Sequence, residues 1–390
     1  MEIRHGLISA DSHCGFDRDA FTSRMQASKW GERIPQVIEV EHESKKVHRW
    51  AVYEKPRGDN VGNCPVLMGD PFPTYPQRWE EVSNKGYDPH ERLKALDTDG
   101  IDAEVLFPNP PGGTFYEFND ADFELDVVRA YNDSLAAWTT VSDRYMPVTI
   151  IPYLSDPLII RGEIERVTAA GHRGINLQGQ APAPLPHLTD PYWDPIWDVC
   201  QALGVPVHFH GSAGVRAGMS TRFWSGYSER QGHSAMTSTS AVTPAQIIPQ
   251  LIFSGITERF PALKFVFAEA GIGGLNYILA ACDHEWEVRR LWTEGISKRP
   301  SETVRRQMFT NFWFETEGIK LRHEIGIDNL MWESDFPHVA SFYPRSWESV
   351  EHVLEDIPTE DRRKLLYENA IKVYGIDASP RQVEREEARA

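Results

Sequence analysis

The 390-residue sequence has few cysteines and a deficit of basic side chains. Its four cysteines are widely spaced and form no Cys-x-x-Cys pair, so they do not predict a zinc knuckle. We expect reduced, buried thiols. Forty Lys and Arg residues stand against 57 Asp and Glu residues. The formal net charge of −17 argues against a general nucleic-acid binder, which needs a basic surface.

Long apolar runs are also missing. No apolar stretch reaches the length of a membrane-spanning helix, and the N-terminal residues do not resemble a signal peptide. We therefore expect a cytoplasmic protein with no membrane partner. The chain length suits one large α/β barrel with insertions better than two ordinary domains, and the 41% hydrophobic content is enough for a sizeable core.

Short apolar segments alternate with segments of helical periodicity, which is typical of parallel βα units. The predicted strands are 6–13, 103–107, 148–153, 174–177, 205–210, 263–268, 308–314 and 330–334. The predicted helices are 89–97, 120–143, 157–170, 194–203, 244–253, 274–291, 320–325, 344–354 and 359–374. The count of eight βα units is partly guided by the family resemblance given below.

Two long segments interrupt this alternation. Residues 14–88 are rich in Pro, Gly and charge, with a hairpin predicted around 46–53, and residues 211–242 are rich in Gly, Ser and Thr. We interpret both as insertions, after the first and the fifth strand. Residues 1–376 are then one domain, and 377–390 are a charged C-terminal tail.

Four of the predicted strands end in residue types that bind metal ions. Two of these residues share the first strand, where alternation places their side chains on the same side. Because the chemistry of a (β/α)8 barrel lies at the C-terminal ends of its strands, we expect one metal site there. The candidate ligands are Asp11, His13, His210, Glu269 and Asp335.

The motifs around these residues resemble a known family. Asp-Ser-His at 11–13, His-Phe-His-Gly at 208–211, Phe-Ala-Glu-Ala-Gly-Ile-Gly-Gly at 267–274 and Met-Trp-Glu-Ser-Asp-Phe-Pro-His at 331–338 occur in this order. Together they resemble the amidohydrolase superfamily, in its amidohydrolase-2 branch. That branch holds metal-dependent hydrolases and nonoxidative decarboxylases related to aminocarboxymuconate semialdehyde decarboxylase. The resemblance covers residues 5–376 and implies an α/β (β/α)8 TIM barrel of the metal-dependent hydrolase type.

The resemblance also implies roles for the predicted ligands. Asp11 and His13 occupy the place of the first-strand metal pair, where more familiar amidohydrolases have His-x-His. His210 matches the ligand of the fifth strand. Asp335 matches an aspartate that binds the metal and takes the proton from metal-bound water. From the residues alone, Asp11 could instead cap a turn and His13 could be a buried structural histidine.

Glu269 departs from the decarboxylases of the family, which have His at this position. A glutamate can accept a proton from water, bridge two metal ions, or cap the Gly-rich start of the next helix. We favour a metal-bound or bridging role. No Lys is placed to form the carbamylated bridge of some binuclear relatives. We expect one or two divalent ions of Fe, Zn or Mn, and the oxygen donors favour the harder ions.

The other histidines leave alternatives open. His338 could bind a metal, orient Asp335 or bind substrate. His208 could be a second ligand of the fifth strand, but we favour a core histidine that orients the site through a hydrogen bond. His233 and His284 are weaker candidates, and His284 lies within a predicted helix.

We expect a metal-dependent hydrolase in which a metal lowers the pKa of bound water to ~7. The carbonyl substrate would be an amide, ester, lactone or acyl thioester such as acyl-CoA, with Asp335, Glu269 and His338 as catalytic residues. The alternative is a nonoxidative decarboxylase of an aromatic or unsaturated acid, against which Glu269 argues. A non-catalytic binding protein on a barrel scaffold is the alternative from another class. We expect a homo-oligomer acting on a small molecule, which the two insertions allow to be large.

Overall fold

The computed structural model describes residues 1–58, 61, 76–109, 115–211, 226, 231, 234, 235, 237–239 and 242–380. His233, Cys64 and most of the predicted 211–242 insertion lie outside the described residues. The described residues form two compact units. One consists of residues 1–173, 334–347 and 378–380, and the other of residues 174–333 and 348–377.

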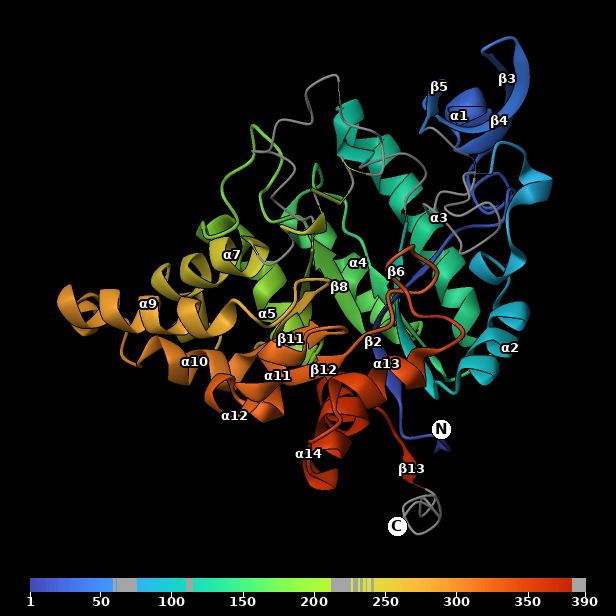
Figure 1. The fold of residues 1–390 in the computed structure, drawn as a ribbon. Coiled ribbons are helices and arrows are strands. Elements are labelled where there is room, and N and C mark those ends of the chain that lie inside the picture. The colour runs from blue at the N-terminus through green and yellow to red at the C-terminus, as the bar shows by residue number, and fades with distance from the viewer. Residues whose placement is uncertain are drawn as a thin grey trace. The chain divides into compact units, whose positions relative to one another are not determined.

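Three neighbouring parallel strands form the centre of the first unit. They are β2 (Ile8–Cys14), β6 (Ala103–Pro108) and β7 (Tyr145–Thr149), paired in the order of the chain. Every described residue of β2 and β7 is buried, as expected for parallel strands covered on both faces. The main helices of this unit are α2 (Pro89–Asp99), α3 (Ala121–Thr139) and α4 (Pro157–Ala169), labelled in Figure 1.

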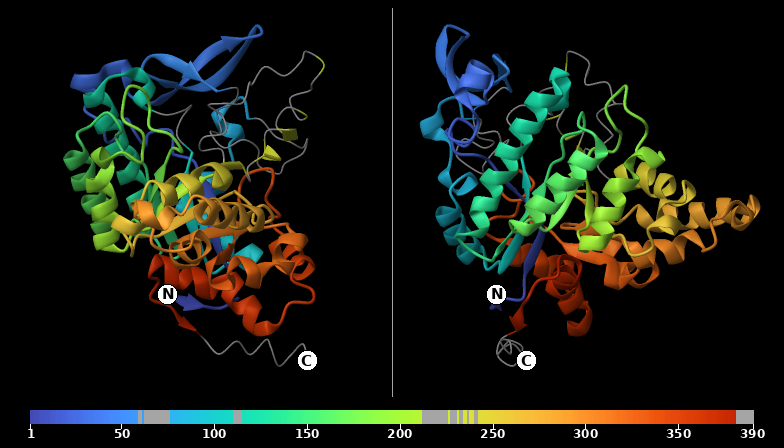
Figure 2. Two further views of the ribbon diagram at one scale, coloured as in Figure 1. Left: turned by 90° about the vertical axis from the view of Figure 1, so that its left-hand side faces the viewer. Right: turned by 180° about the vertical axis from the view of Figure 1, so that it is seen from behind.

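Part of the predicted 14–88 insertion is an antiparallel sheet of β3 (Gln36–His42), β4 (Lys45–Val52) and β5 (Lys55–Arg57). The hairpin predicted around 46–53 is therefore wrong in position. These residues form one strand, and the hairpin turns come before and after it. Glu43 and Ser44 make the first turn with φ of 48° and 62°, as type I′ hairpins require. In Figure 2 this sheet projects from one end of the first unit, and the paired β1 (Glu2–Ile3) and β13 (Ser379–Pro380) lie at the other end.

The second unit contains five parallel strands, each paired with the next in the chain. They are β8 (Gly174–Leu177), β9 (Val207–His210), β10 (Phe265–Ala268), β11 (Met308–Phe312) and β12 (Leu330–Trp332). Their helices are α5 (Asp194–Leu203), α7 (Val242–Phe253), α8 (Ile256–Arg259), α9 (Leu275–Val288), α10 (Pro300–Gln307), α11 (Thr316–Lys320), α12 (Arg322–Ile325), α14 (Thr359–Arg363) and α15 (Asn369–Tyr374).

The remaining described elements are short. They are α1 (Ala27–Trp30), α13 (Ser346–Val353), the 3-10 turns Gly31–Arg33, Trp79–Glu81, Asn84–Gly86, Phe115–Phe118, Pro191–Trp193, Leu291–Glu294 and Ile327–Asn329, and a π-helical turn at Lys364–Glu368. The structure thus confirms eight parallel strands that alternate with helices. In the part of the chain that is described, no helix has the length and apolarity needed to span a bilayer.

Candidate metal centre

Two predicted ligands lie on β2, and a third lies in the segment that follows β12. Asp11 and His13 lie in the C-terminal half of β2 (Ile8–Cys14), and Asp335 is the third residue after β12 (Leu330–Trp332). The Asp335 N–H donates to the carbonyl of Asp11 at 3.0 Å, and the His13 N–H donates to the carbonyl of Phe336 at 2.7 Å. These two backbone bonds hold the Asp335 segment beside the end of β2.

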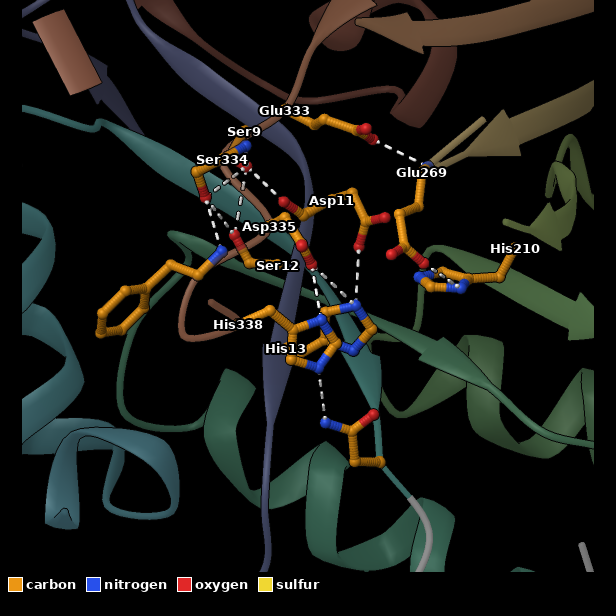
Figure 3. A network of polar contacts seen from close by, with 12 residues as sticks. Ser9, Asp11, Ser12, His13, His210, Glu269, Glu333, Ser334, Asp335 and His338 are labelled. Carbon is orange, nitrogen blue, oxygen red and sulfur yellow. Dashed lines mark hydrogen bonds and ion pairs between the residues drawn. The ribbon is translucent and has the colours of Figure 1, made fainter. Parts of the chain in front are cut away.

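The side chains of this cluster converge on one another, as Figure 3 shows. His13 Nε2 lies 3.5 Å from Asp11 Oδ1 and 3.3 Å from Asp335 Oδ1. His338 Nδ1 lies 2.8 Å from the same Asp335 oxygen. Both aspartates are fully buried, and His13 is 3% exposed. The structure therefore brings together three predicted site residues of the first unit and His338.

This cluster fits a divalent metal ion. Carboxylate oxygens and imidazole nitrogens are ligands for Zn, Fe and Mn. Ligand atoms around an ion with bonds of about 2.1 Å lie about 3.0–3.5 Å apart, and the His13 contacts above have this spacing. The ligand atoms of His13, Asp335 and His338 all lie within 4.8 Å of one another.

Electrostatics favour the anionic form of Asp335 that a metal requires. Burial alone would raise the pKa of its carboxyl group, but the neighbouring His338 and His13 imidazoles lower that pKa below its usual range. A ligand that is already ionised does not have to release a proton when a cation binds.

His338 is held from both sides of its ring. Its Nε2 atom lies 3.2 Å from Asn109 Nδ2, which can only donate a hydrogen bond. The Nε2 atom therefore accepts, and the ring proton resides on Nδ1, which faces Asp335. The sequence analysis missed Asn109. Its position directly after β6 is the strand-end signal that could have found it.

In the second unit, His210 ends β9 and Glu269 follows β10. His210 Nδ1 lies 3.3 Å from Glu269 Oε2 (Figure 3). A Cβ atom on Gly211 would lie 2.3 Å from the carbonyl oxygen of Glu269, so the residue after His210 must be glycine for these segments to approach. The two predicted site residues of this unit are thus brought together.

Glu269 does not cap the next helix. The N-cap of α9 is Gly274, and no side chain caps that helix. Instead, the Glu269 N–H donates at 3.0 Å to the carboxylate of Glu333, a fully buried residue that the sequence analysis did not select. Of the three roles considered for Glu269, the structure removes the helix cap. Metal binding and proton acceptance remain.

Both strand-end carboxylates have an unusual backbone conformation. Glu269 has a φ of 49° and Asp335 a φ of 54°, a left-handed region that residues other than glycine adopt uncommonly, aspartate more readily than glutamate. Such conformations are costly and occur mainly where the surrounding structure enforces them, often at functional sites. The sequence carries no signal for them.

Three serine hydroxyls support the Asp335 segment. Ser9 Oγ donates to the Asp11 carbonyl at 2.6 Å and accepts from the Ser334 N–H at 2.9 Å. The hydroxyls of Ser9, Ser12 and Ser334 lie 3.0–3.1 Å from one another, and all three residues are buried. This network fixes the backbone on both sides of the predicted ligands, and the sequence analysis missed it.

His208 is a core histidine. Its Nδ1 atom donates to the carbonyl of Ile175 at 3.0 Å, and its Nε2 atom lies 3.1 Å from the Tyr374 hydroxyl. Burial lowers the pKa of His208 to about 3, so the ring is neutral. Both ring nitrogens contact protein groups, which supports the core role over a second ligand of β9. His284 lies on α9 and is exposed.

A family model described as Amidohydrolase matches residues 47–376. The chain belongs to this family. Among curated proteins, it is 26% identical to a gamma-resorcylate decarboxylase of Polaromonas sp. (strain JS666 / ATCC BAA-500), over 77% of this chain and 91% of that protein. It is 23% identical to a 2-amino-3-carboxymuconate-6-semialdehyde decarboxylase of Dictyostelium discoideum, over 77% of this chain and 80% of that protein. The branch predicted from the motifs is confirmed.

Solved structures confirm the fold. An amidohydrolase of Mycobacterium avium subsp. paratuberculosis K-10 matches 95% of this chain and 99% of its own, with a TM-score of 0.74 and 19% identity. A dihydroxybenzoic acid decarboxylase of Polaromonas sp. JS666, with bound manganese and the inhibitor 2-nitroresorcinol, matches 97% of this chain and 98% of its own, with a TM-score of 0.61 and 20% identity. The fold is the (β/α)8 barrel of the amidohydrolases.

The expected hydrolysis of an amide, ester, lactone or acyl thioester is wrong. Both curated relatives are decarboxylases, and so are several of the similar solved structures. The prediction of hydrolysis rested on Glu269, which differs from the His that the resemblance assigns to the decarboxylases. A metal site of this kind can polarise a carbonyl for attack by water or hold an oxygen of an acid that loses carbon dioxide, so one ligand type does not select the reaction.

Proposed function

We propose that the protein is a metal-dependent nonoxidative decarboxylase of a small aromatic or unsaturated carboxylic acid. The buried cluster of Asp11, His13, Asp335 and His338 carries this proposal, because it offers a divalent ion two carboxylates and an imidazole, with a second imidazole beside them that can handle a proton. The decarboxylase relatives support the choice of reaction.

Asp11, His13 and Asp335 would hold the ion, and the sequence-based prediction that His210 and Glu269 are metal ligands is retained as part of the proposal. Manganese is the first candidate, since the Polaromonas dihydroxybenzoic acid decarboxylase contains it. A bound ion would supply a fixed positive charge that holds an oxygen of the substrate and stabilises negative charge as it develops.

The reaction requires one proton per turnover. The bond between the carboxylate carbon and the substrate breaks, carbon dioxide leaves, and the remaining electron pair on carbon takes up a proton. His338 carries a proton on Nδ1 against the ionised Asp335. We assign to His338 the task of taking up a solvent proton on its second ring nitrogen and delivering it to the substrate carbon, which returns the ring to its neutral form, while the ionised Asp335 stabilises the charged ring in between. Asn109 keeps the ring in the required tautomer.

The test is a measurement of carbon dioxide release by the manganese-loaded protein from hydroxybenzoates, 2,6-dihydroxybenzoate among them, and from unsaturated dicarboxylic acids. We expect release with at least one acid, a product that retains one solvent hydrogen at the former carboxyl position, and loss of release in Asp335→Asn. Failure with every acid at several metal loadings, combined with turnover of an ester or amide, would overturn the proposal.

A further inference from the structure

The guanidinium group of Arg92, on α2, is fully buried in the first unit. Arg92 Nε and Nη2 each donate to one carboxylate oxygen of Glu104 at 2.8 Å, which makes a two-pronged ion pair. Glu104 lies on β6 and is also fully buried. This pair lies outside the metal-ligand cluster, and the reaction proposed above does not use it.

Arg92 also reaches the segment that carries Asp335. Its Nη2 atom donates at 3.0 Å to the carbonyl oxygen of Phe336, and its Cζ atom lies 4.3 Å from the centroid of the Phe336 ring. The same carbonyl oxygen accepts the His13 N–H at 2.7 Å. One backbone oxygen, next to Asp335, therefore joins Arg92 to the strand end that bears His13.

We propose that Arg92 is a positioning residue for the metal site. By fixing the Phe336 carbonyl, it holds Asp335 on one side and His13 on the other at the spacing that an ion requires. The inference rests on the proposed metal binding by these two residues. Arg92 does not contact the reacting atoms and has no part in the chemistry.

The geometry explains why this residue is an arginine. The two Nη2 hydrogens serve Glu104 and Phe336, while Nε serves the second Glu104 oxygen and Nη1 lies 3.4 Å from the Lys85 carbonyl. A planar fork with five donors can make these bonds together, whereas a lysine ammonium group cannot. A buried ion pair that served stability alone could be replaced by apolar residues of similar volume with little loss.

Three variants separate positioning from stability. Arg92→Met combined with Glu104→Leu removes both charges, leaves no buried ion unpaired and takes away the Phe336 contact. Arg92→Lys keeps the charge but loses the fork. The matched control is Asp99→Asn, on the same helix, where a buried carboxylate accepts from the Ser346 N–H at 2.9 Å and from its hydroxyl at 2.6 Å without touching Phe336.

The first readout is the dissociation constant of Mn²⁺, measured by calorimetry or chelator competition. We expect both Arg92 variants to bind Mn²⁺ about tenfold or more weakly, and Asp99→Asn to bind it like the unsubstituted protein even if its Tm falls as far. The second readout is amide hydrogen exchange of the metal-free protein. The peptides that contain His13 and Phe336 should exchange their amide hydrogens faster in the Arg92 variants. In the Asp99→Asn control their exchange rate should be unchanged.

The outcomes distinguish this inference from the assignment of the metal site. If the unsubstituted protein binds Mn²⁺, Asp335→Asn does not, and the Arg92 variants bind and exchange as before, the positioning role is overturned while the site stands. If Asp335→Asn binds Mn²⁺ as tightly as the unsubstituted protein, the metal assignment fails. Faster exchange in the Arg92 variants would then still support the conclusion that Arg92 fixes the backbone at Phe336.

Discussion

The imidazole rings of His13 and His338 stack on each other, with centroids 3.9 Å apart and planes inclined by 26°. Both rings direct a nitrogen at the same oxygen of Asp335, at 3.3 Å and 2.8 Å. Two charged rings at this distance would repel each other, so the stack favours at most one protonated imidazole. This relationship suits a neutral His13 as metal ligand beside a His338 that handles the proton.

Asp335→Asn should abolish turnover and leave the fold intact. The substitution preserves the shape of the side chain but removes the negative charge that faces the two imidazoles and the proposed ion. We expect carbon dioxide release to fall by about a thousandfold or more, which corresponds to about 4 kcal/mol of activation free energy. Circular dichroism checks the fold. Activity within about tenfold of the unsubstituted protein, or ~1.4 kcal/mol, would contradict the assignment.

Asp11→Ala and His13→Ala should lower metal content and thermal stability together. A ligand that binds only the folded state stabilises it by about 2.7 kcal/mol at a concentration of 100 Kd. The Tm of the unsubstituted protein should therefore rise with Mn²⁺, and the Tm of both variants should respond far less. His284→Ala, which changes an exposed histidine on α9, is the control and should keep the full response. The same Mn²⁺ response in all four proteins would remove β2 from the site.

Much of the fold is predictable from the sequence because buried parallel strands are short apolar runs between helices. The predicted strand 174–177 and helix 194–203 have the same bounds in the structure, where Gly204 ends the helix with a φ of 69°. The strand predicted at 148–153 lies at 145–149 instead. Pro147 lies within this strand, where it donates no hydrogen bond, and its carbonyl accepts from the Arg173 N–H.

The site could be predicted only in part. The ligand residue types at strand ends are visible in the sequence because side chains alternate along a strand. Outside the site, the two-residue hairpin turn at Glu43 and Ser44 is also hidden in the sequence, because it lacks the Asn-Gly or Asp-Gly pair that marks type I′ turns. Likewise, the left-handed backbone at Glu269 and Asp335 depends on contacts with distant residues, such as the bond from the Glu269 N–H to Glu333. No local pattern encodes those contacts.

Glu124→Gln should change how stability depends on pH. The Glu124 carboxylate is buried and accepts the N–H groups of Tyr153 and Leu154. Burial raises the pKa of Glu124 to about 7, although the two N–H groups act against the increase. In the unfolded chain the pKa is about 4.3, so the folded state binds more protons between these values and loses stability as pH rises through about 7.

The measurement is urea unfolding of both proteins at pH 5 and pH 8. Relative to the unsubstituted protein, Glu124→Gln should gain about 2–3 kcal/mol of unfolding free energy over this range, because it cannot ionise. Glu163→Gln is the matched control. Burial acts against ionisation of Glu163, but Arg166 lowers its pKa, so Glu163 is ionised in both states above pH 5. The difference in unfolding free energy between Glu163→Gln and the unsubstituted protein should therefore be the same at pH 5 and pH 8. A constant difference for Glu124→Gln too would contradict the raised pKa.

Variants of Glu269 distinguish between the remaining roles of this residue and its neighbour His210. If Glu269 bridges two ions, Glu269→Ala should lose one metal equivalent and most of the activity. If it binds one ion or serves only as a base, activity should fall while metal content stays near one equivalent. Glu269→Gln is the companion variant, since it keeps the length of the side chain beside His210 Nδ1 but not the charge. Metal analysis and carbon dioxide release are measured on all variants.

Glu269→His is the most informative of these changes. It introduces the residue type that the resemblance assigns to the decarboxylases at this position, and it removes the carboxylate that contacts His210 at 3.3 Å. We expect the variant to bind metal and to retain part of the decarboxylase activity, because an imidazole can also hold a proton or a metal ion. Glu269→Ala should be less active than Glu269→His. Full activity in Glu269→Ala would show that Glu269 serves neither the metal nor the proton, and His210 would then need another partner to orient its ring.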